Sequence, residues 1–288
     1  MANEEMAAEQ RSRALIDALP YIKEFNDCVV VVKYGGSSHA VGPELDSFAD
    51  DIVFLRSIGI NVVVVHGGGP QVDEAMKIYG MEPEFVDGLR VTDKETLMVA
   101  RMVLVGQVGR EIVTAINRHG GIAVGTTGED GRLISAHQRD ERLGFVGEVD
   151  GINASILESL YFEDLVPVIA PIGVDEEGQS LNINADEAAS AIAIGLGAKK
   201  LIVMSNIPGL LKDVNDPESV ISEISSIEAR QLIDSDSISA GMIPKIRSCV
   251  DAVDGGVEKA HIIDGRVPHS VLVELFSDAG IGTMFTSE

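Results

Sequence analysis

Short runs of β-branched residues alternate with longer amphipathic stretches along most of this chain. The runs Cys28–Val32 and Asn61–Val65 are almost continuously apolar, which is typical of strands buried on both faces of a sheet. Similar, shorter runs lie at Ile122–Val124, Val166–Ile169, Leu201–Met204 and Ala260–Ile263. Helical periodicity is found between and after the strands, at 44–58, 70–79, 93–118, 186–196, 227–234 and 244–254. This alternation predicts an α/β fold with a mainly parallel central sheet.

The N-terminal stretch has a different character. Residues 4–19 predict a helix, with Leu15 and Leu19 four residues apart and Ile22 continuing the same apolar stripe. Pro20 should kink or interrupt this helix. Such a stripe is either packed locally against its own domain or buried against another subunit, and the sequence leaves both open.

Two further regions break the alternation of strands and helices. Residues 81–91 and 132–150 show short, turn-punctuated alternation, which predicts antiparallel hairpins at the margin of the sheet. Thr92 followed by Glu95 predicts a capping box at the start of the long helix. A division near Gly197 would separate two lobes of one continuous sheet.

The composition indicates which kinds of partner the protein can bind and in which compartment it is expected. The 288 residues include 22 Lys and Arg against 46 Asp and Glu, a net charge of −24, which argues against nucleic acid as the main partner. A few placed cations would still bind phosphate. Cys28 and Cys249 match no metal-ligand spacing and no disulfide framework. We see neither a signal peptide nor an apolar run of membrane-spanning length, so we expect a cytoplasmic protein with no membrane contact.

Glycine-rich loops follow two of the apolar strands. One strand ends in Lys33-Tyr34-Gly35-Gly36, and the other in His66-Gly67-Gly68-Gly69-Pro70. Ligands gather at the carboxyl ends of strands in an open α/β sheet, and a helix start offers free N–H groups to an anion. The glycines could merely form tight turns. Two such loops, one with a lysine at the strand end, favour an anion-binding site.

Four charged residues and one asparagine are candidates for that site. Lys33 ends a buried strand, where a lysine is costly without a negative partner. Lys245 stands at a helix start, where a cation is disfavoured unless an anion offsets the dipole, although it could be a solvated surface residue. Asn182 and Asp186 would share one face of a strand end, but Asp186 could equally be a helix cap. Arg90 is either a surface residue or a clamp for a carboxylate.

With these motifs in order, the chain resembles the amino acid kinase family over residues 27–288. The motifs that carry the resemblance are Lys33–Gly36, His66–Pro70, Gly88–Thr92, Leu143–Gly147, Asn182–Asp186 and Gly241–Lys245. The resemblance implies a three-layer αβα sandwich. It also implies phosphorylation of the γ-carboxylate of N-acetyl-L-glutamate by ATP in arginine biosynthesis, with Mg²⁺ held mainly by the ATP phosphates and no metal site formed by the protein. Residues 27–197 would form the amino-acid and dimerisation lobe, and 198–288 the nucleotide lobe.

The resemblance also assigns roles to single residues. Lys33 and Lys245 would be the two cations that stabilise the transferring phosphoryl group, and Asp186 the aspartate that orients them. The implied ligands of the amino acid are Gly68, Gly69, Arg90 and Asn182. The implied nucleotide and phosphate contacts are Gly35, Gly36, Ser205, Asn206, Gly209, Leu210 and Lys212. Asn206 stands where the family usually has aspartate.

The N-terminal helix and the C-terminal stretch resemble the arginine-inhibited branch of this family. There, Tyr21, Glu274 and Gly282 would bind L-arginine, and residues 1–26 would link dimers into a hexamer, a trimer of dimers. A PII-type nitrogen-signalling protein would be a further partner. Two alternatives remain open from the sequence: a kinase of acetylated or carrier-bound aminoadipate, and a catalytically silent amino-acid sensor on the same fold.

Overall fold

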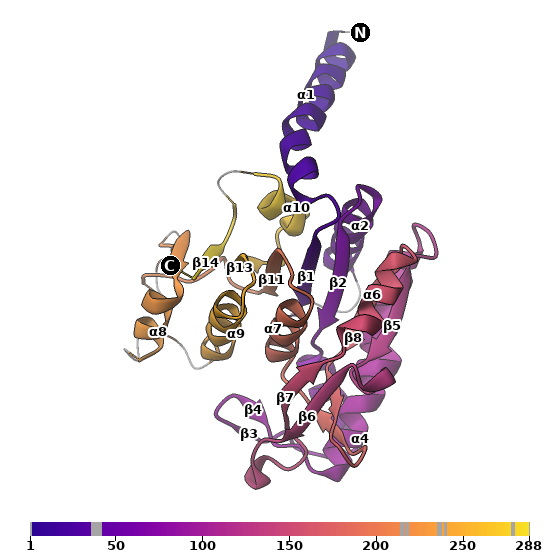
Figure 1. Cartoon of the computed structure of the whole chain (residues 1–288), viewed down its shortest axis with the longest axis vertical. Helices are drawn as coiled ribbons and strands as arrows, with labels where there is room; N and C mark the ends of the chain where they lie inside the picture. Colours follow the sequence, from indigo (N-terminus) through magenta and orange to yellow (C-terminus); the bar gives the residue numbers. More distant parts are fainter. Residues whose placement is uncertain are drawn as a thin grey trace.

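The computed structural model describes the chain except residues 1, 36–41, 214–215, 217–218, 235–237, 239–240, 278–279 and 288. An eight-stranded sheet forms its centre, in the order β12–β14–β13–β11–β1–β2–β8–β5 (Figure 1). The neighbouring strands run parallel, except that β13 and β14 pair antiparallel. These strands are β1 (Val29–Tyr34), β2 (Asn61–His66), β5 (Ala123–Thr127), β8 (Val166–Ala170), β11 (Lys200–Ser205), β12 (Glu223–Ser225), β13 (Lys259–Asp264) and β14 (Thr283–Thr286). The predicted α/β fold with a mainly parallel sheet is confirmed.

Helices cover both faces of the sheet and complete a three-layer sandwich. One apolar cluster includes residues of α2 (Pro43–Ser57), α3 (Gly69–Ile78), α5 (Gly109–Asn117) and α10 (Ser270–Leu275). The other includes residues of α6 (Ala154–Phe162), α7 (Ala185–Gly195), α8 (Ser226–Asp234) and α9 (Ile243–Asp254). The sequence did not predict α6, α10, β12 or β14, because these elements are short and lack a clear period.

The alternation of side chains along β1 decides where its last residues point. Val30 and Val32 belong to the first cluster and Val31 to the second, as expected for a strand buried on both faces. Lys33 therefore falls on the face covered by α7 and α9. Tyr34 falls on the other face, where its ring lies 4.4 Å from that of Phe48.

The two predicted hairpins exist, but neither extends the main sheet. β3 (Phe85–Val86) and β4 (Leu89–Arg90) pair with each other alone, across a turn in which Asp87 and Gly88 both have positive φ. β6 (Ile134–Gln138) and β7 (Gly147–Ile152) belong to a separate four-stranded sheet. Its other members are β9 (Ile172–Val174) and β10 (Ser180–Asn182), which the sequence did not predict.

The long helix predicted at 93–118 is present in three segments. α4 (Lys94–Val103) passes through a π-helical turn at Leu104–Val108 and continues as α5. Its cap is Asp93, whose carboxylate accepts the N–H of Thr96 at 2.7 Å. The predicted capping box on Thr92 is therefore wrong, and the Thr92 hydroxyl donates instead to the carbonyl of Arg90. A π-helical turn is rare and commonly marks a functional site.

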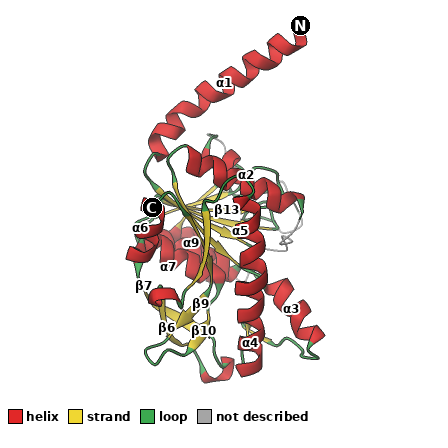
Figure 2. Cartoon of the chain, turned by 90° about the vertical axis from the view of Figure 1, so that its right-hand side faces the viewer, coloured by secondary structure: helices red, strands yellow, loops and turns green. Residues whose placement is uncertain are grey.

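The first helix, α1 (Ala2–Phe25), projects away from the rest of the molecule (Figure 2). It continues through Pro20, so this proline does not interrupt it. Leu15 and Leu19 are exposed to 66% and 42%, whereas Phe25 at the helix end is buried. No described helix combines the length and the apolar character that crossing a bilayer requires.

Candidate functional site

Three charged side chains meet at the carboxyl end of β1. Asp186, in the first turn of α7, accepts contacts from Lys33 and Lys245, with both Nζ–Oδ distances at 2.8 Å. Lys245 lies in the first turn of α9, so two helix starts and one strand end converge. The cap of α7 is Asn184, whose side chain accepts the N–H groups of Asp186 and Glu187. Asp186 is thus free of the capping role that its position allowed, and Lys245 is not a solvated surface lysine.

Burial and charge act in opposite directions on this cluster. Burial alone would raise the pKa of Asp186, but the two ammonium groups outweigh it and hold the pKa at about 2. Burial lowers the pKa of Lys33 to about 8, against the attraction of Asp186 and with the repulsion of Lys245. The cluster carries one positive charge in excess, so it suits an anion.

A cavity of about 220 Å³ opens beside this cluster. Its lining includes Lys33 and Asp186, the glycines at 67–69, Arg90 and Asn182. The glycine loop enters α3 directly, so its N–H groups lie at a helix start. A Cβ on Gly68 would lie 2.6 Å from Leu104 Cδ2, which shows how closely the π-helical turn packs on this loop. The structure therefore brings together the residues that the sequence proposed for the amino-acid substrate.

Arg90 reaches this cavity from β4, and contacts with its neighbours hold its guanidinium in place. Its Nη1 lies 2.5 Å from Asp73 Oδ1, its Nη2 donates to the carbonyl of Gly69 at 3.3 Å, and its guanidinium stacks 4.7 Å from the ring centre of Phe85. On the other wall, Asn182 donates to the buried hydroxyl of Thr92 at 3.1 Å. Sequence reasoning missed the supporting roles of Asp73 and Thr92. The spacing of Asp73, one helical turn after the glycine loop, was the available signal.

The proposed nucleotide residues follow β11, the strand that pairs with β1 on the side away from β2. Ser205 ends β11 and is buried, and its hydroxyl has no hydrogen-bond partner among the described residues. Leu210 is also buried, and its N–H donates at 2.7 Å to Oγ1 of Thr283, the first residue of β14. The proposed nucleotide residues that the structure describes between 205 and 212 do not line the cavity of Lys33. Gly35 lies against the Lys33 ammonium, and Gly36 is outside the described residues.

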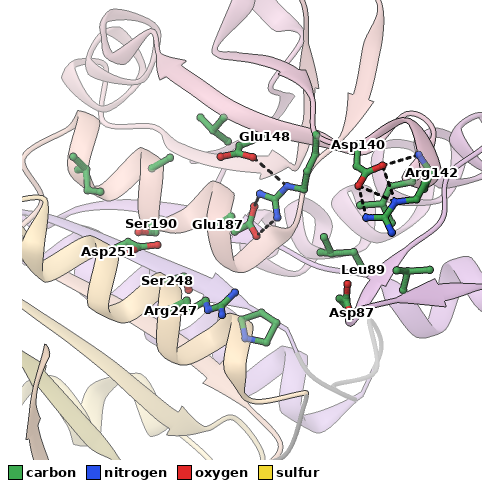
Figure 3. A pocket seen from close by; sticks show the side chains of 17 residues that line it. Asp87, Leu89, Asp140, Arg142, Glu148, Glu187, Ser190, Arg247, Ser248 and Asp251 are labelled. Carbon is green, nitrogen blue, oxygen red and sulfur yellow. Dashed lines mark hydrogen bonds and ion pairs between the residues drawn. The ribbon is translucent and has the colours of Figure 1, made fainter. Parts of the chain in front are cut away.

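A larger cavity, of about 550 Å³, lies between the β3–β4 hairpin, β7 and the helices α7 and α9 (Figure 3). Its most prominent feature is the guanidinium of Arg139, which contacts both carboxylate oxygens of Glu187 at 3.1 and 2.6 Å and lies 3.5 Å from Glu148. Glu187 directly follows Asp186, so this ion pair connects the first turn of α7 to the four-stranded sheet. No periodic pattern in the sequence predicts this network.

A further cavity, of about 360 Å³, brings together the three residues proposed for arginine. Tyr21 comes from the end of α1, Glu274 from α10, and Gly282 from the turn before β14. Glu274 is buried; it contacts His261 Nδ1 at 2.6 Å and accepts the N–H of Ile281 at 2.9 Å. Burial alone would raise the pKa of Glu274, but the contacts with His261 and Ile281 and the charge of Lys200 together outweigh it and lower the pKa. The carboxylate is thus kept ionised inside a partly enclosed cavity.

Residues 29–264 match the model of the amino acid kinase family. Among curated relatives, the chain is 49% identical to the acetylglutamate kinase of Methanothrix thermoacetophila over 286 residues, covering 96% of this chain and 99% of the relative. It is 48% identical to the acetylglutamate kinase of Nostoc sp. over 279 residues, covering 96% and 94%. The acetylglutamate kinase of Methanococcus aeolicus is 44% identical over 289 residues, with 96% and 98% covered.

Solved structures share the fold at lower sequence identity. N-acetylglutamate synthase from Neisseria gonorrhoeae, complexed with coenzyme A and N-acetyl-glutamate, superimposes with a TM-score of 0.85 at 24% identity. The match covers 96% of this chain but only 63% of the synthase chain. Carbamate kinase from Giardia lamblia bound to AMP-PNP has a TM-score of 0.65 at 16% identity, with 91% and 99% covered. These likenesses show the fold.

Proposed function

The chain belongs to the amino acid kinase family, and from this premise we propose that it transfers the γ-phosphoryl group of ATP to the side-chain carboxylate of N-acetyl-L-glutamate. The observation that carries the proposal is the pair of lysines joined on one buried aspartate beside a glycine loop. Relatives at 44–49% identity over nearly the whole chain carry the same activity in their names.

The chemistry needs charge neutralisation more than it needs a base. A carboxylate is ionised at neutral pH, so it attacks phosphorus without losing a proton. Its oxygen forms the new bond to the γ-phosphorus while the bond to the β,γ-bridging oxygen breaks, which gives an acyl phosphate and ADP. The barrier lies in bringing two anions together, and positioned cations and N–H donors lower it.

We assign the cations to Lys33 and Lys245, which would contact the phosphoryl group as negative charge shifts to the leaving ADP. Asp186 would hold both ammonium groups in place and would not react itself. The N–H groups of Gly68 and Gly69 would hold the attacking carboxylate. Arg90 would bind the α-carboxylate through its planar guanidinium, together with Asn182.

The residues after β11 are suited to a polyanionic nucleotide. Ser205 places a hydroxyl that has no partner among the described residues at the carboxyl edge of the sheet, two residues beyond the register partner of Lys33. Mg²⁺, when bound with ATP, would neutralise phosphate charge, and the phosphates and water would supply most of its ligands. We accordingly assign residues 27–197 to the amino-acid lobe and 198–288 to the nucleotide lobe.

The test is coupled ADP release with N-acetyl-L-glutamate, glutamate and acetylated aminoadipate compared at equal concentrations. We expect N-acetyl-L-glutamate to be preferred. One methylene in a pocket accounts for about 1–3 kcal/mol of discrimination, so aminoadipate should react about 10–200 times more slowly. Higher turnover of aminoadipate would support that alternative, and no ATP turnover with any of the acids would support a silent sensor.

We also propose that L-arginine inhibits the enzyme by binding the cavity of Tyr21, Glu274 and Gly282. An ionised, buried carboxylate is suited to a guanidinium, and Tyr21 belongs to the helix that we assign to hexamer formation. Arginine must then bind the inactive geometry more tightly than the active one.

A further inference from the structure

His66, the last residue of β2, is completely buried directly before the glycine loop. Its Nδ1 lies 2.9 Å from the carbonyl oxygen of Gly67. A carbonyl oxygen only accepts, so Nδ1 must carry the proton. Burial lowers the pKa of His66 to about 4, so the ring is neutral and its Nε2 is unprotonated. No described residue hydrogen-bonds to Nε2.

The planarity of the peptide turns this hydrogen bond into a constraint on the next residue. In a trans peptide the C=O of Gly67 and the N–H of Gly68 point in opposite directions. A donor that fixes the carbonyl of Gly67 therefore fixes the direction of the Gly68 N–H. Gly68 lines the substrate cavity, whereas His66 does not.

The surrounding packing holds the imidazole ring in this position. A Cβ on Gly109, the residue after the π-helical turn, would lie 3.1 Å from His66 Nε2. Leu104 and Val108 in that turn pack against Gly68 itself. The π-helical turn thus packs against the loop, and the residue that follows the turn lies close to the ring.

We propose that His66 is a positioning residue for phosphoryl transfer: its Nδ1–H holds the carbonyl of Gly67 so that the N–H of Gly68 points at the attacking carboxylate. This inference rests on the proposed function for the role of Gly68. His66 itself does not touch the substrate.

Three substitutions separate the hydrogen bond from the bulk of the ring. His66→Asn places an amide nitrogen close to the Nδ1 position and should keep turnover within about fivefold of the wild type. His66→Gln places its amide nitrogen near Nε2, and His66→Phe removes the donor. Loss of a donor acting directly on the reacting group typically costs on the order of 10²–10³ in kcat, so an indirect loss should cost about 10–100-fold. The KM for ATP should stay unchanged, and His137→Gln, at an exposed histidine, serves as control.

Histidine-selective ¹⁵N NMR tests the hydrogen bond without using activity. The His66 signal, assigned through its backbone in the wild-type enzyme, should show a protonated Nδ1 and an unprotonated Nε2, unchanged between about pH 5 and 8. A proton on Nε2 would overturn the proposal, and this measurement decides it even if the variants do not fold.

Turnover of the variants tests the proposed role of His66 independently. Wild-type kcat in folded His66→Gln and His66→Phe, or an equal loss in His66→Asn, would also overturn the proposal. A wild-type enzyme that phosphorylates none of the acids would instead refute the proposed function, and the tautomer would still report on the hydrogen bond.

Discussion

At the scale of single residues, the site depends on a charged cluster that is almost free of water. The side chains of Lys33 and Asp186 are exposed to only 5% and 8%, and that of Lys245 to 15%. Desolvation costs several kcal/mol for each ion, and one carboxylate cannot neutralise two ammonium groups. The resting site is therefore short of one negative charge. An incoming phosphoryl group would supply it.

Removing either cation should therefore slow the chemical step more than it weakens binding. We expect Lys33→Ala and Lys245→Ala each to lower kcat by on the order of 10²–10³, with much smaller changes in KM. Steady-state kinetics checks this, with the exposed Lys77→Ala on α3 as control. Near-normal kcat in either site variant would refute the assignment.

The lowered pKa of Lys33 predicts a pH dependence. Lys33 neutralises charge only when it is protonated, and its pKa of about 8 means that it loses its proton as the pH rises through that value. We expect kcat/KM, which reports on the free enzyme, to fall above about pH 8. Lys33→Arg, which stays protonated, should be slower overall but lose this decrease. A flat wild-type profile to about pH 9.5 contradicts the prediction.

Individual site residues were predictable to different degrees. Lys33 was found because a lysine at the end of an apolar strand needs a partner, and Asp186 because it follows an alternating polar face. Neither argument predicted the contact between Lys33 and Asp186, because these residues meet only through the packing of α7 on β1. The contacts of Arg90 with Asp73 and of Asn182 with Thr92 depend on side-chain geometry across elements, which sequence spacing does not fix.

At the scale of elements, the contact between the π-helical turn and the glycine loop can be tested. We expect Gly68→Ala to lower kcat and to destabilise the fold by about 1–3 kcal/mol, because its Cβ would overlap Leu104 Cδ2. Adding Leu104→Ala should recover part of both losses, since the double variant removes the overlap. Urea unfolding and turnover of the single and double variants measure this coupling.

The control for that cycle is Gly106→Ala, in the same turn, where an added Cβ meets nothing within 4 Å. It should change stability and turnover little. If Gly68→Ala lowers stability and turnover equally with and without Leu104→Ala, the packing of the π-helical turn does not restrict residue 68.

Regular strands and helices were easier to predict than the π-helical turn or the pairing of strands that lie far apart in the sequence. Buried strands and amphipathic helices have a period that follows from which faces meet the core. The π-helical turn has no such signal, because one extra residue in a turn leaves the apolar pattern almost unchanged. The hairpin at 132–150 was predicted, but its pairing with β9 joins Ser135 to Val174, which lies 39 positions away along the chain.

At the scale of the whole molecule, α1 exposes apolar side chains to solvent. Deleting residues 1–24 removes exposed Leu15 and Leu19, along with Tyr21 of the proposed arginine cavity. We expect an active dimer that L-arginine no longer inhibits. Sedimentation and inhibition curves check both properties.

In the full-length chain, Leu15→Glu combined with Leu19→Glu should prevent hexamer formation while sparing the cavity itself. This variant separates assembly from arginine binding. A truncated protein that remains hexameric and arginine-sensitive refutes the role of the helix.

The central place of β1 also bears on how the chain is synthesised. Its partner β2 follows about 30 residues later, but its other partner, β11, is made only when residues 200–205 have been translated. Until then, Val30 to Lys33 have an unpaired edge in an apolar strand, which is a template for aggregation. A nascent chain paused near Gly197 would therefore depend on chaperones, and a gene split at that point should yield an N-terminal fragment that precipitates unless the other half is co-expressed.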